Sequence, residues 1–179
     1  YGHTNPTIEV VRELVKRGNQ VHYYSFYEFR SRIEETGAVC IPCDDFMPPA
    51  PKDIDKKVGK DLSSLVDMTV DVTLAMEDKV LGELRAWKPD CIVSDSICIW
   101  GKLYAKKLNV PFVCSTTTFA FNQQTARLMK QSLSELLRML SGMPRINARL
   151  RQLRRHGYEI RQFYELLQND NDTETIVYT

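Results

Sequence analysis

Short apolar segments alternate with amphipathic helical segments along this sequence, and this alternation limits the fold more than any other feature. Residues rich in β-branched and aromatic side chains, as in buried strands, occur at 20–25, 38–43, 90–94 and 110–114. Helical periodicity separates them, at 6–17, 28–36, 62–87 and 100–108. Strands that alternate with helices pair in parallel, in a sheet covered by helices on both faces. We therefore expect the α/β class and a Rossmann-like, doubly wound parallel sheet.

The two ends of the sequence do not fit a complete sheet of this kind. The first helix has no strand before it, although a doubly wound sheet places its first strand at the centre. After residue 119 we expect mostly helix to residue 168, interrupted at 141–144, then a turn at 169–172 and the beginning of a strand at 175–179. We therefore expect a domain truncated at both ends, with its central strand before Tyr1.

Composition narrows the classes of function. The 179 residues are 43% hydrophobic and 26% charged, which is typical of one globular domain. Lys and Arg (24) nearly balance Asp and Glu (23), so no overall field favours nucleic acid. No apolar run approaches the roughly 20 residues of a membrane span, and no signal peptide is visible. The five cysteines are an odd number and indicate reduced thiols, as in a cytoplasmic protein.

The opening turn is the most function-specific segment. Asn5 is a favourable N-cap, and Pro6 fits the first helical position, so the turn before them is expected to be rigid. His3 would then project from a fixed turn at a helix entrance. A lone histidine in such a place also serves for capping or packing, and that reading stays open.

Topology brings a carboxylate to this histidine. In the usual strand order 3-2-1-4-5, the strand expected before Tyr1 neighbours the strand that ends at Asp95. Their carboxyl ends would lie about 5 Å apart, at the point where open α/β sheets bind ligands. A carboxylate beside an imidazole fixes its tautomer and stabilises the imidazolium that forms on proton uptake. Asp95 could equally cap the following helix.

These residues match a known family. Three segments resemble family 1 glycosyltransferases of the two-domain GT-B fold. They are the Gly-His-Thr-Asn-Pro-Thr turn at 2–7, the Glu-Leu-Val-Lys-Arg-Gly segment at 13–18 and the strand at 21–23. Segments 89–95 and 108–113 resemble that family's fourth and fifth strand region, so the match spans nearly the whole chain. Within the family, the sequence is most like bacterial macrolide glycosyltransferases and UDP-glucosyltransferases.

The resemblance implies an inverting transfer of a sugar from a nucleotide donor to a hydroxyl of a hydrophobic small molecule. His3 matches the general base, Asp95 its carboxylate partner, and Thr117 a position near the donor sugar. Residues 1–179 would be the N-terminal acceptor-binding domain, without the C-terminal nucleotide-sugar domain, and inactive alone. The co-substrate would be a UDP-sugar, with UDP-glucose the commonest case, and no cofactor or metal is implied. Candidates to line the acceptor cleft are Phe46, Met47, Phe119, Phe121, Met129, Met139 and Met143.

Two other functions compete with this one. The chain could be a non-catalytic subunit that presents an acceptor or lipid while a separate chain supplies the donor site. A generic dinucleotide-binding domain is disfavoured, because only Gly2 stands at the turn where G-x-G-x-x-G would be needed. The acceptor, the donor sugar, the oligomeric state and the physiological role are not readable from these residues.

The cysteines, the methionines and a run of arginines each have a structural interpretation as well as a functional one. Cys40 and Cys43 have CxxC spacing but fall in an expected strand, so a buried pair is favoured over zinc or redox chemistry. The other three cysteines, and methionines 129–143, read as core residues, although the methionines also suit an acceptor pocket. The arginines of 145–161 form a basic helix, for which a solvated face is favoured over weak contact with an anionic membrane or with the donor phosphates or donor domain.

Overall fold

The structure of the protein is a computed structural model that describes residues 2–49, 62–116, 133–167 and 173–178, with only the backbone at 133–139 and 167. The chain divides into two compact units. The first unit comprises residues 1–47 and 177–179, and the second comprises residues 48–176. Each unit is described by itself.

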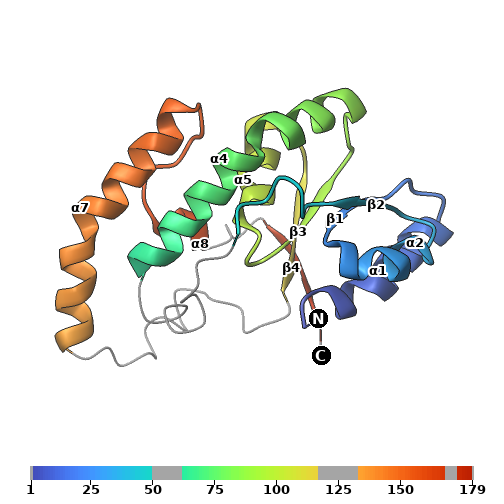
Figure 1. Cartoon of the computed structure of the whole chain (residues 1–179), viewed down its shortest axis with the longest axis horizontal. Coiled ribbons are helices and arrows are strands. Elements are labelled where there is room, and N and C mark those ends of the chain that lie inside the picture. The colour runs from blue at the N-terminus through green and yellow to red at the C-terminus, as the bar shows by residue number, and fades with distance from the viewer. Residues whose placement is uncertain (1, 50–61, 117–132, 168–172, 179) are drawn as a thin grey trace. The chain divides into compact units, whose positions relative to one another are not determined.

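The first unit places helices beside a pair of parallel strands (Figure 1). Its strands are β1 (His22–Ser25) and β2 (Val39–Pro42), paired from His22 with Val39 to Ser25 with Pro42. Its helical elements are α1 (Thr4–Lys16), the 3-10 turn η1 (Tyr27–Phe29) and α2 (Arg30–Glu34). All of them fall where the sequence predicts helix or strand.

Helix α1 ends as its sequence predicts. Gly18 has φ +87°, a left-handed conformation that glycine adopts without steric cost. Its N–H donates to the carbonyl of Val15, and the N–H of Asn19 donates to that of Leu14, so the last helical carbonyls are satisfied.

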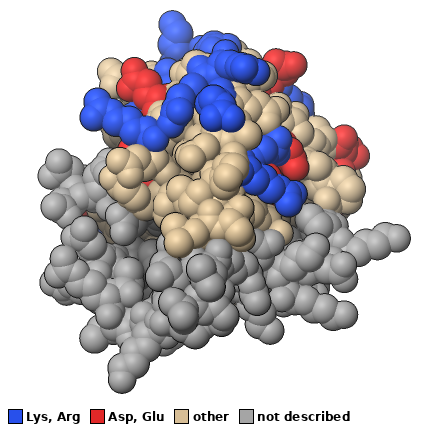
Figure 2. All heavy atoms as spheres, turned by 90° about the vertical axis from the view of Figure 1, so that its left-hand side faces the viewer, with Lys and Arg blue, Asp and Glu red and all other residues tan. Residues whose placement is uncertain are grey.

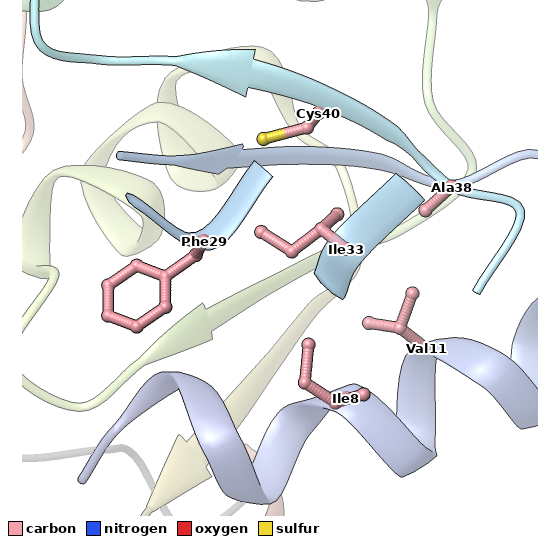
Figure 3. Packing of buried hydrophobic residues seen from close by; sticks show 6 residues of the cluster. All are labelled: Ile8, Val11, Phe29, Ile33, Ala38 and Cys40. Carbon is pink, nitrogen blue, oxygen red and sulfur yellow. The ribbon is translucent and has the colours of Figure 1, made fainter. Parts of the chain in front are cut away.

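Apolar side chains from the helices and from β2 form one core in the first unit (Figure 3), and Tyr23 of β1 packs against it. Ile8 and Val11 are one turn apart on α1 and therefore lie on the same face. Ile33 of α2 is fully buried. The complete set is Ile8, Val11, Phe29, Ile33, Ala38 and Cys40. This core fixes α1 against the strand pair and so fixes the turn that carries His3.

The second unit builds a three-stranded sheet against helices (Figure 1). The sheet order is β3-β4-β5, and β3 pairs with β4 in parallel, from Ile92 with Phe112 to Asp95 with Ser115. The strands are β3 (Ile92–Asp95), β4 (Phe112–Thr116) and β5 (Glu174–Val177). The helices are α4 (Leu62–Trp87), α5 (Ile99–Leu108), α7 (Leu133–Arg155) and α8 (Tyr164–Leu167).

These strand neighbours agree with the predicted order. The expected arrangement 3-2-1-4-5 places the strand at 22–25 beside that at 39–42, and the strand at 92–95 beside that at 112–116. Both neighbouring pairs form, and both are parallel. The α/β class with parallel pairing is therefore confirmed within each unit.

Helix α4 is the centre of the second unit. It buries a stripe of side chains along its whole length, including Val70, Met76 and Val80, and packs against α5 and α7. From α5, the fully buried Tyr104 donates its hydroxyl to the Thr73 carbonyl at 2.6 Å. A buried tyrosine hydroxyl needs such a partner, because an unpaired one would lose its hydrogen bond to water without replacement.

The predicted interruption of the helix at 141–144 is wrong. Helix α7 runs through Pro144 without a break and lies along α4 (Figure 1). Buried Ile146, Leu150 and Leu153 hold its second half, and this packing outweighs the helical hydrogen bond that proline cannot make. Gly142 lies where a side chain would collide with Ser63 of α4, so the glycine permits close approach rather than ending the helix.

Helix resumes in α8 and reaches Leu167, as expected, but the break between α7 and α8 was not predicted. Gly157 has φ +80° and follows the last turn of α7, and residues 158–163 are not helical. Tyr158 and Ile160 in this segment are buried. Among the described residues, no helix is both long and apolar enough to cross a membrane.

Candidate active site

His3 stands at the entrance of α1, in the first unit. It is the N-cap residue, with φ −92° and ψ −34°, and its side chain is half-buried. Its side chain does not make the usual capping hydrogen bond to the first turn. The helix therefore begins at Thr4, and the prediction that Asn5 is the N-cap is wrong. The Asn5 side chain instead accepts a hydrogen bond at 2.7 Å from Arg32 of α2.

Asp95 is the last residue of β3, in the second unit. One carboxylate oxygen accepts the backbone N–H of Ile97 at 2.9 Å, which shapes the turn that leaves the strand. Asp95 is not the N-cap of the next helix, because α5 begins at Ile99 with Cys98 in that place. The carboxylate lies near the thiol of Cys98. Burial is the main cause that raises the pKa of this thiol to about 12, and the charge of Asp95 raises it further.

Both residues therefore end up where the sequence predicts, one at a helix entrance and one at a strand end. They belong to different units, so their pairing stays a prediction. Beside Asp95 lies a cavity of about 20 Å³, bordered also by Ile99, Lys102 and Phe112. Such a volume fits a single water molecule and is far too small for a sugar or an acceptor.

Of the residues predicted to line an acceptor cleft, two described ones belong to the first unit and two to the second, so their convergence stays a prediction. Phe46 and Met47 are half-buried in the turn after β2, where both backbone N–H groups donate to the Cys43 carbonyl. Met143 is half-buried on α7, and Met139 lies on the same helix, where only its backbone is described. Thr117, Phe119, Phe121 and Met129 lie outside the described residues.

The basic helix has a largely structural explanation. Arg145 and Arg149 of α7 form ion pairs with Asp67 of α4, and Arg149 also pairs with Asp71. Arg154 donates to two backbone carbonyls just beyond the helix, at 2.7 and 2.6 Å.

Exposed arginines remain on this helix, among them Arg151 and Arg155. Lys and Arg side chains are also prominent on the face of the molecule in Figure 2. The predicted solvated face therefore holds for Arg151 and Arg155, whereas Arg149 is largely buried in ion pairs.

The cysteines behave mostly as predicted. Cys40 and Cys43 are buried free thiols, and burial raises the pKa of Cys40. Cys114 is buried, but Cys91 is exposed, so its assignment to the core is wrong because it precedes β3 rather than lying within it. The described residues contain no cluster of His, Cys, Asp and Glu that could hold a metal ion.

Sequence reasoning missed the groups that hold the His3 turn in place. Tyr23 of β1 and Thr7 of α1 join their hydroxyls at 2.6 Å. The aromatic and β-branched composition of segment 20–25 correctly placed Tyr23 in a strand, but nothing local to the sequence showed that its hydroxyl meets α1.

Comparison of the sequence with characterised proteins identifies relatives, although no protein-family model matches it. NDP-glycosyltransferase YjiC of Bacillus licheniformis is 36% identical over 129 residues, which are 69% of this chain and 32% of that protein. Its namesake in Bacillus subtilis is 29% identical over 125 residues, 69% of this chain and 31% of that protein. Demethyllactenocin mycarosyltransferase of Streptomyces fradiae is 34% identical over 137 residues, 70% of this chain and 29% of that protein.

The fold is similar to solved glycosyltransferase structures. The glycotransferase of kitacinnamycin matches with a TM-score of 0.69 and 21% identity, over 98% of this chain and 42% of that one. The calicheamicin glycosyltransferase CalG4 matches with a TM-score of 0.67 and 23% identity, over 99% and 43%. The chain thus spans about a third of the length of its curated relatives and under half of these solved chains. By its sequence relatives and its fold together, the chain belongs to the glycosyltransferases of the GT-B fold.

Proposed function

We propose that residues 1–179 are the acceptor-binding and catalytic-base domain of an inverting, nucleotide-sugar-dependent glycosyltransferase. A separate nucleotide-sugar-binding domain would supply the donor. The observation that carries the proposal is His3 at the N-cap of α1, in a chain of this family: the imidazole sits on an ordered turn, and no described contact uses it to cap the helix.

The acceptor hydroxyl is a weak acid, so its transfer reaction needs a base to take its proton. An acceptor hydroxyl attacks the anomeric carbon of the donor as its O–H bond breaks, and the nucleoside diphosphate leaves with the electrons of the old bond. His3 would take the proton, which contributes about 10² to 10⁴ in rate for a well-placed base. Asp95 would fix the imidazole tautomer and stabilise the imidazolium that forms. Attack opposite the leaving group inverts the anomeric centre.

The acceptor and donor classes are supported by the names of relatives. Demethyllactenocin mycarosyltransferase acts on a named natural product, which fits a hydrophobic small-molecule acceptor. A UDP-glucosyltransferase of Bacillus subtilis, YojK, is 27% identical over 72% of this chain and supports UDP-glucose. The neighbours SsfS6 and VinC, with TM-scores of 0.51 and 0.54, were solved with thymidine diphosphate, which supports a TDP-sugar instead. We infer UDP-glucose as the first donor to assay, with TDP-glucose beside it.

The deciding experiment is turnover of the complete gene product with a panel of hydrophobic acceptors and both donors. His3→Ala should lower kcat by about 10² to 10⁴-fold without unfolding the protein. His22→Ala is the matched control, because His22 is an exposed histidine of β1 in the same unit. Wild-type turnover in His3→Ala would overturn the assignment of the base. Acceptor binding without transfer from any donor would favour a non-catalytic presenting subunit.

A further inference from the structure

The first turn of α1 is tied to its neighbours through a chain of hydroxyl groups. The Thr7 hydroxyl donates to the Thr4 carbonyl at 2.8 Å, and the same hydroxyl lies 2.6 Å from the hydroxyl of Tyr23 on β1. Thr4 is the residue directly after His3. A half-buried contact therefore runs from the strand, through Thr7, to the carbonyl of the residue that follows the proposed base.

The direction of this chain of hydrogen bonds follows from counting protons. A threonine hydroxyl carries one proton, and in this geometry Thr7 uses it on the Thr4 carbonyl. Its oxygen can still accept, so Tyr23 must be the donor to Thr7. Phenylalanine at position 23 would keep the ring and remove only this donor.

A second contact holds the same turn from α2. Arg32 donates to the Asn5 side chain at 2.7 Å, but this contact is exposed and therefore weaker. Asn5 and Thr7 lie on either side of Pro6, in the first turn of the helix. The turn is thus fastened to a strand and to a helix of the same unit.

These contacts replace the capping bond that the helix lacks. An N-cap side chain ordinarily accepts an N–H of the first turn and stabilises the helix start, but His3 makes no such bond. A first turn without its cap frays unless something else holds it. Here the Tyr23 and Arg32 contacts hold it, while the imidazole is not used for capping.

We propose that Tyr23, acting through Thr7, is a positioning residue for His3, with Arg32 in a lesser supporting role. The inference rests on the proposed function, because it supposes that the place of the His3 ring matters for transfer. A displacement of a reacting group by about 1 Å can cost 10²-fold in rate. A tether to a strand in a packed core limits such displacement, since β1 is held by its pairing with β2.

The test compares variants that differ by single hydroxyl groups in the complete gene product. Tyr23→Phe and Thr7→Val should each lower kcat about 10-fold or more while KM for the acceptor and donor stays within about twofold. Thr7→Ser keeps the hydroxyl and should restore most of the rate. Tyr27→Phe is the matched control, since it removes a tyrosine hydroxyl bonded at 2.9 Å to Asp45 on the surface of the same unit.

A second readout separates positioning from simple loss of stability. Histidine-selective NMR should show the His3 ring signals shifted or broadened in Tyr23→Phe and unchanged in Tyr27→Phe. Loss of folded protein alone would lower the active fraction but leave kcat per folded molecule and the His3 signals unchanged, and would overturn the proposal.

Failure of this inference is distinguishable from failure of the proposed function. If His3→Ala is inactive while Tyr23→Phe and Thr7→Val turn over like wild type, the positioning role is wrong and the base assignment stands. If His3→Ala turns over like wild type, both are overturned.

Discussion

The Lys107 ammonium donates to the Glu77 carboxylate at 2.5 Å, and this ion pair joins α5 to α4 with only 18% and 14% of the two side chains exposed. The second carboxylate oxygen lies 2.9 Å from His156 Nδ1. Lys107 also donates to the His156 carbonyl at 2.6 Å and lies 4.2 Å from the centre of the Tyr158 ring. One carboxylate thus links two helices to the segment that follows α7.

This cluster predicts a dependence of stability on pH. Burial raises the pKa of Glu77, but the hydrogen bonds from Lys107, His156 and Tyr158 and the charge of Lys107 together lower it by more, so the pKa in the folded protein lies below its ordinary value of 4.5. The unfolded state therefore binds the proton more readily. The stabilising contribution is full above 4.5 and is lost as the pH falls through the lower, folded value.

The measurement is urea unfolding of wild type and Glu77→Gln at several pH values. Glu77→Gln should cost about 1 to 3 kcal/mol at neutral pH, because it leaves a largely buried ammonium without its counter-charge. Below pH 4.5 the difference between the two proteins should shrink. Glu83→Gln, which alters an i,i+4 pair with Lys79 on the same helix, should cost about 0.5 kcal/mol or less. A difference that grows in acid would contradict the linkage.

The arginines of α7 should differ sharply in their effect on stability. Arg149 is 21% exposed, lies 3.2 Å from an Asp67 carboxylate oxygen and donates to the Asp67 carbonyl at 3.1 Å. Arg149→Met should cost roughly 2 to 4 kcal/mol, because it leaves the half-buried Asp67 with less compensation. Arg151→Met, on the exposed side of the same helix, should stay within about 0.5 kcal/mol. Equal losses in thermal unfolding would mean that the interhelical pairs contribute little.

Helices and strands were predicted well from the sequence wherever nearby residues determine them. The four strands expected from their β-branched and aromatic composition, β1 to β4, lie within two residues of their expected positions, and α4, expected from helical periodicity, matches its expected bounds. Parallel pairing and the neighbour order followed from the alternation of strands and helices. These features depend on residues near one another along the chain, which periodicity can read.

The predictions that were wrong concern features set by contacts between segments far apart in the sequence. Pro144 was expected to end a helix, but packing on α4 carries α7 through it. Asn5 was expected to cap α1, but its side chain binds Arg32, 27 residues away. The arginines of α7 gave no local sign of their partners Asp67 and Asp71, about 80 residues earlier. For the candidate site, local sequence located His3 and Asp95, but not the hydroxyl tether from Tyr23.

A side chain at position 142 should be unfavourable while the Ser63 hydroxyl faces it. A Cβ at position 142 would overlap Ser63 Oγ, whereas Ser63 Cβ would lie at an ordinary 3.6 Å. Gly142→Ala should therefore destabilise wild type by about 1 kcal/mol, despite the better helix propensity of alanine. In a Ser63→Ala background the same change should stabilise by about 0.5 to 1 kcal/mol. A double-mutant cycle by urea unfolding measures this coupling, and a coupling near zero would refute the close approach.

Asp95→Asn separates the charge of this residue from its place in the turn. The amide oxygen of asparagine can still accept the Ile97 N–H, which lies at 2.9 Å from the carboxylate, so the turn after β3 should persist. If Asp95 stabilises an imidazolium on His3, loss of the charge should lower kcat by about 10² to 10⁴-fold with little change in thermal stability.

Asp90→Asn is the matched control, because Asp90 is exposed just before the same strand. Asp95→Ala should lose both the charge and the turn, and so lower kcat and the unfolding temperature together. Turnover of Asp95→Asn at the wild-type level, with Asp95→Ala merely less stable, would assign the carboxylate to the turn alone. His3 would then need a different partner, or none, for its proton.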